Sequence, residues 1–144
     1  MRTITLSVLL TSVFALFAAC GMLGPKKVFQ TEDDLRREYK KSESEFKAKY
    51  DGKEVSAAGR AGSVAMAGEA GGIVYFETNT HESVSGAPSI ACYVGSDGAS
   101  RFNELKVEKG TLMRVKGKMK VEALTMRLED CKLEQVGPSA LSGE

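Results

Sequence analysis

The sequence predicts a mainly β fold, a five-stranded Greek-key barrel that follows an N-terminal amphipathic α-helix. Three observations lead to this prediction. A charged segment with one apolar stripe lies at residues 31–50, segments of strand character follow it, and a short helical segment separates the third strand from the fourth. A chain of 144 residues is long enough for one such domain and too short for two.

The first residues, MRTITLSVLLTSVFALFAACG, place one basic residue before an apolar run that extends from Ile4 to Ala19. This run is shorter than the roughly 20 residues that a membrane-spanning helix needs. A basic start, an apolar stretch and small residues at its end are typical of a secretory signal peptide. We therefore expect residues 1–19 to be a cleaved signal.

Cys20 directly follows two small residues, and the stretch LFAAC resembles the lipobox of bacterial lipoprotein signals. In those proteins the cysteine carries acyl chains such as palmitate and becomes the mature N-terminus. Gly21 stands where an Asp would resemble an inner-membrane retention signal. The resemblance implies a cell-envelope protein that lipid on Cys20 anchors in the outer membrane, facing the periplasm. An ordinary signal with an incidental cysteine is the alternative, and Phe17 departs from the residues usual at its place.

The net charge limits the partners that the protein can bind, and the cysteine count limits the disulfides that it can form. The chain holds 20 Lys and Arg against 19 Asp and Glu, and removal of Arg2 with the signal leaves the two signs equal. A nucleic-acid-binding protein usually carries a clustered basic excess, so no nucleic acid is expected as a partner. If Cys20 carries lipid, Cys92 and Cys131 remain as one possible pair. They are either bonded in an oxidising compartment or buried as two reduced thiols.

Residues 20–30 contain Gly, Pro and a Lys pair and are predicted to be a tether that spans on the order of 30 Å when extended. Thr31 can cap a helix over residues 31–50, with acidic residues in its first turn. The apolar stripe of this helix recurs at steps of three and four residues: Leu35, Tyr39, Ser42, Phe46 and Tyr50. We expect the stripe to pack on the following domain, because the mixed charges of the helix argue against the alternative of a lipid-binding helix.

Asp51 and Gly52 end the helix, and a barrel is predicted over residues 51–135. Its strand segments are KEVSAAGRAGSVAMAG, GGIVYFETNT, APSIACYVG, TLMRVKGKMKVEA and LTMRLEDCKLEQV, with a short helix near residues 101–105. Glycines in the first segment suggest bending or close backbone approach. In the last segment the apolar alternation changes parity, which predicts a β-bulge around Glu129 and Asp130. Residues 136–144 are expected to form a loose tail.

Five strands with a helix between the third and the fourth is the order of the OB-fold. Eight residues carry a closer resemblance: Tyr50, Gly52, Lys53, Cys92, Lys109, Gly110, Gly117 and Cys131. Their pattern is similar to that of a bacterial family of OB-fold lipoproteins with a tRNA-anticodon-binding-like domain. The likeness covers about residues 31–135, although Ser42 and Phe46 stand where that family more usually has Asn and Ala. It implies the fold more firmly than an activity.

The predicted OB-fold brings the two remaining cysteines close together. In such a barrel the third and fifth strands are neighbours, and this places Cys92 and Cys131 on adjacent segments. A disulfide requires a Cα separation of roughly 4.4–6.8 Å, which neighbouring strands provide where the register agrees. The fold therefore favours a disulfide over two reduced thiols.

OB-folds commonly bind ligands on the face of the second and third strands and on the adjoining loops. Here that face is predicted to offer Tyr75, Phe76 and Tyr93 as candidate ligand-binding residues. Stacking on single-stranded nucleic acid is one use of such aromatic side chains, but the balanced charge and the predicted compartment argue against it. An envelope glycan or a small molecule bound by Tyr75 and Tyr93 is an alternative.

The sequence carries no catalytic signature such as a nucleophile elbow or a phosphate-binding loop. His81, the single histidine, has only Glu77 and Glu82 nearby, too few convergent ligands for a metal site, so no metal or cofactor is expected. The basic row of the fourth strand is interpreted as a solvated face, with contact to anionic cell-wall or lipid head groups as the alternative: Arg114, Lys116, Lys118 and Lys120. We expect a non-enzymatic binding or scaffold module whose partner is an unidentified envelope protein or glycan. An envelope enzyme built on Glu77, His81 and Glu82 is the alternative.

Overall fold

The computed structural model describes residues 29–78 and 84–142. The elements in chain order are β1 (Gln30–Thr31), α1 (Glu32–Lys41), α2 (Glu43–Tyr50), β2 (Glu54–Met66), β3 (Gly72–Phe76), β4 (Ile90–Val94), α3 (Ser96–Glu104), β5 (Leu112–Glu122) and β6 (Thr125–Val136), with short 3₁₀ turns at Gly68–Ala70 and Pro138–Ala140. Within the described ranges, no helix is both long and apolar enough to cross a membrane.

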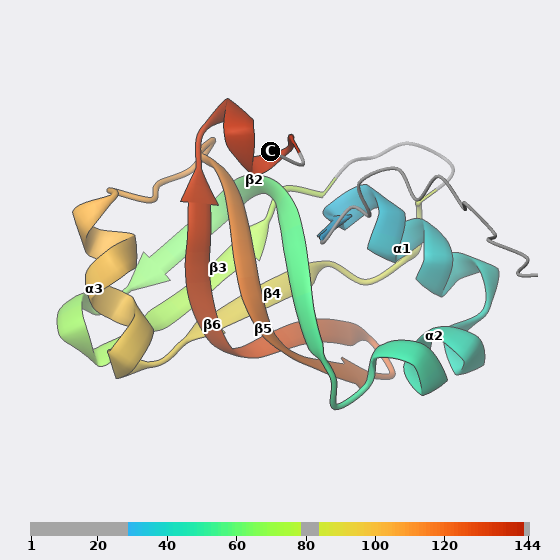
Figure 1. Cartoon of the computed structure of the whole chain (residues 1–144). Coiled ribbons are helices and arrows are strands. Elements are labelled where there is room, and N and C mark those ends of the chain that lie inside the picture. The colour runs from blue at the N-terminus through green and yellow to red at the C-terminus, as the bar shows by residue number, and fades with distance from the viewer. Residues whose placement is uncertain (1–28, 79–83, 143–144) are drawn as a thin grey trace, which may run out of the picture.

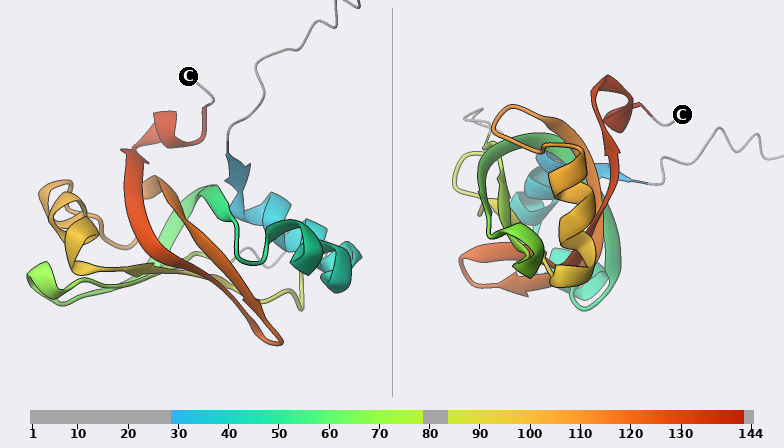
Figure 2. Two further views of the ribbon diagram at one scale, coloured as in Figure 1. Left: turned by 60° about the horizontal axis from the view of Figure 1, so that its bottom comes forward. Right: turned by 90° about the vertical axis from the view of Figure 1, so that its left-hand side faces the viewer.

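The strands β2, β3, β4, β6 and β5 follow one another in the sheet, and β5 pairs back with β2 to close a barrel. β4 and β6 are parallel, and the other neighbours in the barrel are antiparallel. α3 connects β4 to β5 and lies at one end of the barrel, whereas α1 and α2 lie at the opposite end (Figure 1). The right-hand view of Figure 2 looks onto α3, with the barrel strands around and behind it. This strand order confirms the predicted OB-fold barrel.

The predicted helix over residues 31–50 is two helices that meet at Ser42. Thr31 caps α1 as expected, since its Oγ1 accepts a hydrogen bond from the Asp34 amide at 3.1 Å. Ser42 matches the period of the predicted apolar stripe, but its backbone is extended and its side chain accepts a hydrogen bond from the Glu45 amide as the N-cap of α2. A serine inside a helix competes for backbone hydrogen bonds in this way.

The apolar stripe of α1 and α2 packs on the barrel, as the sequence predicts. Leu35, Tyr39, Phe46 and Tyr50 are all buried and belong to the same hydrophobic cluster as the strands. The rings of Tyr39 and Phe46 meet edge to face with centroids 5.5 Å apart, a favoured geometry for aromatic pairs. The helix pair therefore closes one end of the barrel core.

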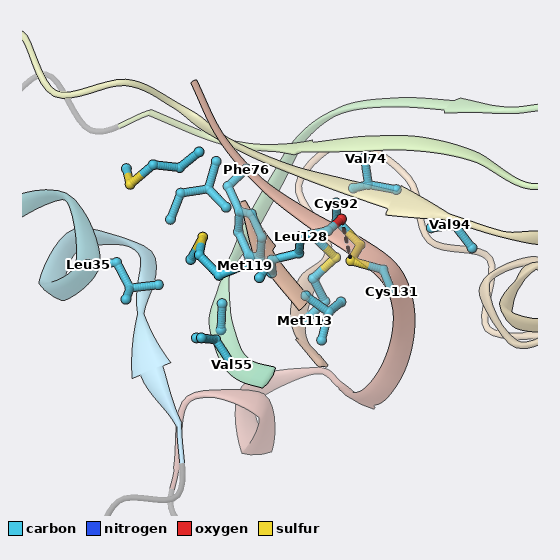
Figure 3. Close-up of a cluster of buried hydrophobic side chains, with 14 of the residues drawn as sticks. Leu35, Val55, Val74, Phe76, Cys92, Val94, Met113, Met119, Leu128 and Cys131 are labelled. Carbon is cyan, nitrogen blue, oxygen red and sulfur yellow. Dashed lines mark hydrogen bonds between the residues drawn. A yellow bond between two sulfur atoms is a disulfide. The ribbon is translucent and has the colours of Figure 1, made fainter. Parts of the chain in front are cut away.

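The barrel interior is filled by the inward-facing residues of every strand. β5 alternates strictly between buried and more exposed positions, the pattern of a strand with one face on the core. Figure 3 shows side chains of Val55, Phe76, Met113, Met119 and Leu128 converging in this interior, with Leu35 approaching from α1. Burial of these apolar side chains, each worth about 1.5–3 kcal/mol, supplies most of the driving force for the fold.

The predicted bulge in β6 is confirmed. Lys118 of β5 pairs with Glu129, but Lys116, two residues earlier, pairs with Lys132, so β6 holds one extra residue in between. Asp130 adopts a left-handed backbone with φ 52° at this point. The strand opposite must approach closely: a Cβ at Gly117 would lie 2.8 Å from the Glu129 carbonyl oxygen. The bulge shifts the buried positions from Leu128 to Cys131, which accounts for the change of parity.

Helix α3 begins at Ser96, earlier than the predicted residues 101–105. The stretch SDGAS is predicted to be a loop turn, but in the structure it forms the first residues of the helix. The amides of Gly98 and Ala99 both donate to the Gly95 carbonyl at 3.1 Å. Gly98 fits tightly against β6, where an added Cβ would lie 2.6 Å from the Cys131 carbonyl oxygen. Glycine at this position therefore serves close packing of the helix on the sheet.

Candidate ligand-binding face

Two of the three predicted aromatic residues lie together on the outer surface of the barrel. Tyr75 is 39% exposed and Tyr93 is 37% exposed. In the β3–β4 register, Tyr75 pairs with Ala91 and Tyr93 pairs with Ile73, so the two tyrosines are diagonal neighbours on one face. Diagonal neighbours of this kind lie about 7–8 Å apart, within reach of aromatic side chains.

The prediction that Phe76 belongs to this face is wrong. Phe76 is only 2% exposed and is part of the barrel core. Successive side chains of a strand point to opposite faces, so Phe76 points inward because its neighbour Tyr75 points outward. Its ring packs against β2, where a Cβ at Gly59 would lie 2.7 Å from Cδ1 of the ring. This contact also explains the glycine that the sequence marks for close approach.

Small neighbours leave the two rings accessible. Tyr75 pairs with Ser63 across to β2, and Ile73 pairs with Ala65. On the other side, Ala91 pairs with Arg127 of β6. Serine and alanine side chains are too short to cover a neighbouring tyrosine ring, so the rings stand above the sheet surface.

Arg127 extends this face from β6. Its guanidinium carbon lies 5.8 Å from the centre of the Tyr93 ring, within the range of a cation–π interaction. Arg127 Nη2 also lies 3.0 Å from a carboxylate oxygen of Glu122 and 3.3 Å from one of Glu129. Arg127 is not among the residues predicted for this face, although its alternation with the apolar residues Met126 and Leu128 indicates that it points outward.

A groove opens beside Tyr93, at the place where β4 and β6 separate. Their parallel pairing extends only as far as Cys92 and Leu128, and the bulge at Asp130 follows directly. The groove has a volume of about 420 Å³ and is lined by Gly72, Tyr93, Val94, Gly95, Arg127, Glu129 and Asp130. We call it the tyrosine groove. The strained backbone of Asp130 at its edge belongs to a class of conformations that cluster at ligand sites.

A larger cavity of about 690 Å³ lies on another side of the barrel, between the start of α1 and the C-terminal turn. Its lining includes Glu32, Asp33, Arg60 and Glu77 together with apolar residues such as Leu141. Arg60 Nε and Glu77 Oε2 lie 3.5 Å apart. Of the residues proposed for an enzyme site, Glu77 is thus placed in this cavity, whereas His81 and Glu82 lie outside the described residues.

Glu32 is a buried charged residue in the lining of this cavity. It is 5% exposed, and its Oε1 lies 3.3 Å from Arg36 Nε one turn along α1. Burial, with the help of Asp33 and against the pull of Arg36, raises the pKa of Glu32 to about 7. Arg36 also donates to the carbonyls of Val84 and Ala87, each at 3.1 Å. These contacts fasten α1 to the segment before β4, which is a structural role.

Arg114 and Lys116, two of the four residues in the basic row of β5, form ion pairs and hydrogen bonds. Lys116 Nζ lies 2.6 Å from Glu54 Oε1 on β2. Arg114 Nε lies 3.6 Å from Glu134 Oε2, and the same guanidinium donates to the side chain of Gln135. Paired charges of this kind suit a solvated strand surface better than an anion-binding patch.

A disulfide joins Cys92 of β4 to Cys131 of β6, with the Cα atoms 5.8 Å apart (Figure 3). This separation lies inside the range that disulfides require. Cys20, the predicted lipidation site, lies outside the described residues. Among residues 29–78 and 84–142, no group of three or more His, Cys, Asp and Glu side chains is arranged to hold a metal ion.

A comparison with protein-family models and with curated protein sequences finds no match for this chain.

Proposed function

We propose that the protein is a lipid-anchored lipoprotein of the bacterial envelope whose OB barrel acts as a non-enzymatic binding module. The observation that supports this most directly is the pair of exposed tyrosines, Tyr75 and Tyr93, on the outer face of β3 and β4. This is the face on which OB barrels commonly bind ligands. The proposed localisation in the cell envelope rests on the LFAAC stretch that precedes the barrel.

The form of the face suits binding rather than chemistry. Exposed aromatic rings offer large, rigid contact areas at low entropic cost, and the small side chains of Ser63 and Ala91 leave them open. Among the described residues, the lining of the tyrosine groove holds no histidine, cysteine or serine. Histidine is the commonest proton carrier, and cysteine and serine are common nucleophiles, so the lining favours binding; an enzyme at this site would have to use the carboxylates of Glu129 and Asp130.

Photo-crosslinking in living cells tests the proposal. A photo-reactive phenylalanine analogue is placed at Tyr75, at Tyr93 or, as the control, at Lys116 on the β2–β5 wall. We expect the same discrete adduct from the two tyrosine positions and none from Lys116, because only the tyrosines lie on the proposed contact surface. Absence of any adduct from Tyr75 and Tyr93, or equal yields from all three positions, would contradict the assignment of this face.

A further inference from the structure

One edge of β2 is left without a strand beside it near the end of the strand. β5 pairs with β2 as far as Arg60. Ala61 then donates to the Thr111 carbonyl at 2.8 Å and accepts from the Gly110 amide at 2.7 Å. Beyond this point, residues 62–66 pair with β3 alone among the described strands. The edge that faced β5 therefore continues past the end of its partner.

The alternation of the β2–β3 ladder shows which backbone groups face this edge. The Ala67 amide, directly after β2, donates to the Gly71 carbonyl at 2.8 Å, so Ala65 in the same phase also bonds to β3. The backbone groups of Val64 and Met66 consequently point to the opposite edge. In the described part of the chain, no turn or loop residue forms a backbone hydrogen bond with either of them.

A groove of about 440 Å³ lies at this edge, where β2 ends beside α3 (Figure 1). Val64 and Met66 line one side of it, and both are partly buried against the barrel core. The end of α3 and residues 106–109 line the other side. The edge is therefore recessed between its own sheet and the connection from α3 to β5. We call this site the β2 groove.

The side chains of the β2 groove do not block an added strand. Residues 61–66 read AGSVAM, without the charges or proline that commonly protect an exposed edge. Across the groove, Lys106 and Lys109 stand together with Glu108, so both signs of charge are present. The charge of a ligand therefore decides little here, and the backbone of Val64 and Met66 decides more.

A row of backbone donors and acceptors is matched along its length by another extended backbone, which lies about 4.8 Å away in a sheet. A second folded copy of this chain does not fit, because its own β2 edge is recessed beside its own residues 106–109. A single extended segment is thin enough to enter. We infer that the β2 groove binds an extended, proline-free segment of a partner protein, which adds to the sheet as a strand beside Val64 and Met66.

Strand geometry also sets the pattern of that segment. Alternate side chains of the added strand share the face of Val64 and Met66, and they pack into the groove beside Val107. The intervening side chains emerge next to Ser63, which pairs with Tyr75. The site thus adjoins the proposed tyrosine face, but it stands on the open edge of β2 and goes beyond that proposal.

The probe is chosen without assuming a sequence. A phage-displayed library of random heptapeptides is selected on the full-length mature protein in detergent, and the enriched peptides are synthesised with capped ends. We expect peptides without proline that carry apolar residues at alternate positions. A selection that enriches no peptide above the uncoated support would overturn the inference.

Amide hydrogen exchange in the ¹⁵N-labelled protein locates the bound peptide. A saturating peptide should slow exchange of the Val64 and Met66 amides at least fivefold, because these amides gain a partner. The Ala65 amide already faces β3 and should change less than twofold. Equal protection of all three amides, or changes confined to Tyr75 and Tyr93, would show that the peptide does not add to this edge.

A matched pair of variants tests the backbone contact. Val64→Pro removes the edge amide and keeps the bonds to β3, since this amide points away from β3. It should weaken peptide binding at least tenfold, whereas Val64→Ile keeps the amide and should stay within about threefold. Equal affinities would contradict strand addition. Thermal unfolding of each variant is recorded, and if Val64→Pro does not fold, the exchange pattern of the wild type decides alone.

The result is independent of the crosslinking test of the tyrosine face. Peptide binding with protected Val64 and Met66 supports the β2 groove even if Tyr75 and Tyr93 yield no adduct. Adducts from the two tyrosines without any peptide binding leave the tyrosine face in place and overturn the β2 groove.

Discussion

Glu32 shows how one buried carboxyl couples the fold to pH. Its folded pKa of about 7 lies above the ordinary value of 4.5, so the folded protein holds a proton at pH values where the unfolded chain has released it. The stability that this proton provides is complete below pH 4.5 and is lost as the pH rises to about 7. Asp33 and Arg36 are the charged groups that act on the pKa of Glu32. On the side of the sheet, a Cβ added at Gly59 would lie 3.2 Å from the Glu32 Cβ.

We therefore expect the free energy of unfolding to fall between pH 5 and pH 7.5, with an upper limit of about 3 kcal/mol for this residue. Glu32→Gln resembles the protonated carboxyl and should remove most of that decrease, as measured by urea unfolding at the two pH values. Glu38→Gln is the matched control in the same helix. The pKa of Glu38 is lowered, with hydrogen bonds from Lys49 and Tyr50 favouring its charged form, so its loss should leave the slope between pH 5 and pH 7.5 unchanged. Equal slopes in wild type and Glu32→Gln would contradict the assignment.

At the scale of elements, the disulfide holds β4 and β6 together just beyond the end of their hydrogen-bonded pairing. Their last paired residues are Cys92 and Leu128, and Cys131 follows after the bulge. A bond across this separation closes a loop of 39 residues, worth about 4 kcal/mol in the chain-entropy model. It also supports one wall of the tyrosine groove, because Val94 and Asp130 lie on the two strands that it joins.

We predict that Cys92 and Cys131 are oxidised in protein isolated from cells. Alkylation without reductant should add no mass to these residues, and alkylation after reduction should add two groups. The double variant Cys92→Ala/Cys131→Ala provides the control, since its mass should not respond to reductant. Two alkylated thiols in unreduced wild type would show that the cysteines are buried side by side without a bond.

Elements with a regular alternation or a defined strand order could be predicted from the sequence, and those that depend on tertiary contacts could not. The parity change after Leu128 located the bulge because a strand on a core has only two faces. The same rule, applied to Tyr75 and Phe76, shows that only one of two adjacent residues can face outward. Ser42 matched the helical period, but its hydroxyl caps α2, a choice that depends on how the two helices meet the barrel. The tyrosine groove could not be predicted from the sequence, because it forms where two strands that are distant in the sequence separate.

At the scale of the whole molecule, the described chain begins beside its own C-terminal segment. The Arg114 guanidinium carbon lies 4.8 Å from the centre of the Phe29 ring, and Arg114 Nη1 donates to the Ser142 carbonyl at 3.3 Å. Phe29 is buried and Gln30 pairs with Ala57 of β2, so the last two residues of the predicted tether, residues 20–30, are part of the folded domain. If lipid on Cys20 anchors the protein, we expect folding of the barrel and attachment to the membrane to be separable.

This separation leads to the last prediction. Cys20→Ala should move the protein from the membrane fraction to the soluble fraction of the envelope, because the thiol that would carry the acyl chains is gone. Its barrel should keep the thermal unfolding temperature of the wild type, since the buried core of the described residues is formed between Phe29 and Ala140. Gly21→Ala, which keeps the cysteine, is the matched control and should remain in the membrane. Fractionation with quantitative immunoblotting measures all three proteins. If Cys20→Ala stays in the membrane fraction as completely as Gly21→Ala, the apolar run before it is an uncleaved anchor or another segment holds the protein there, and the lipid anchor is wrong.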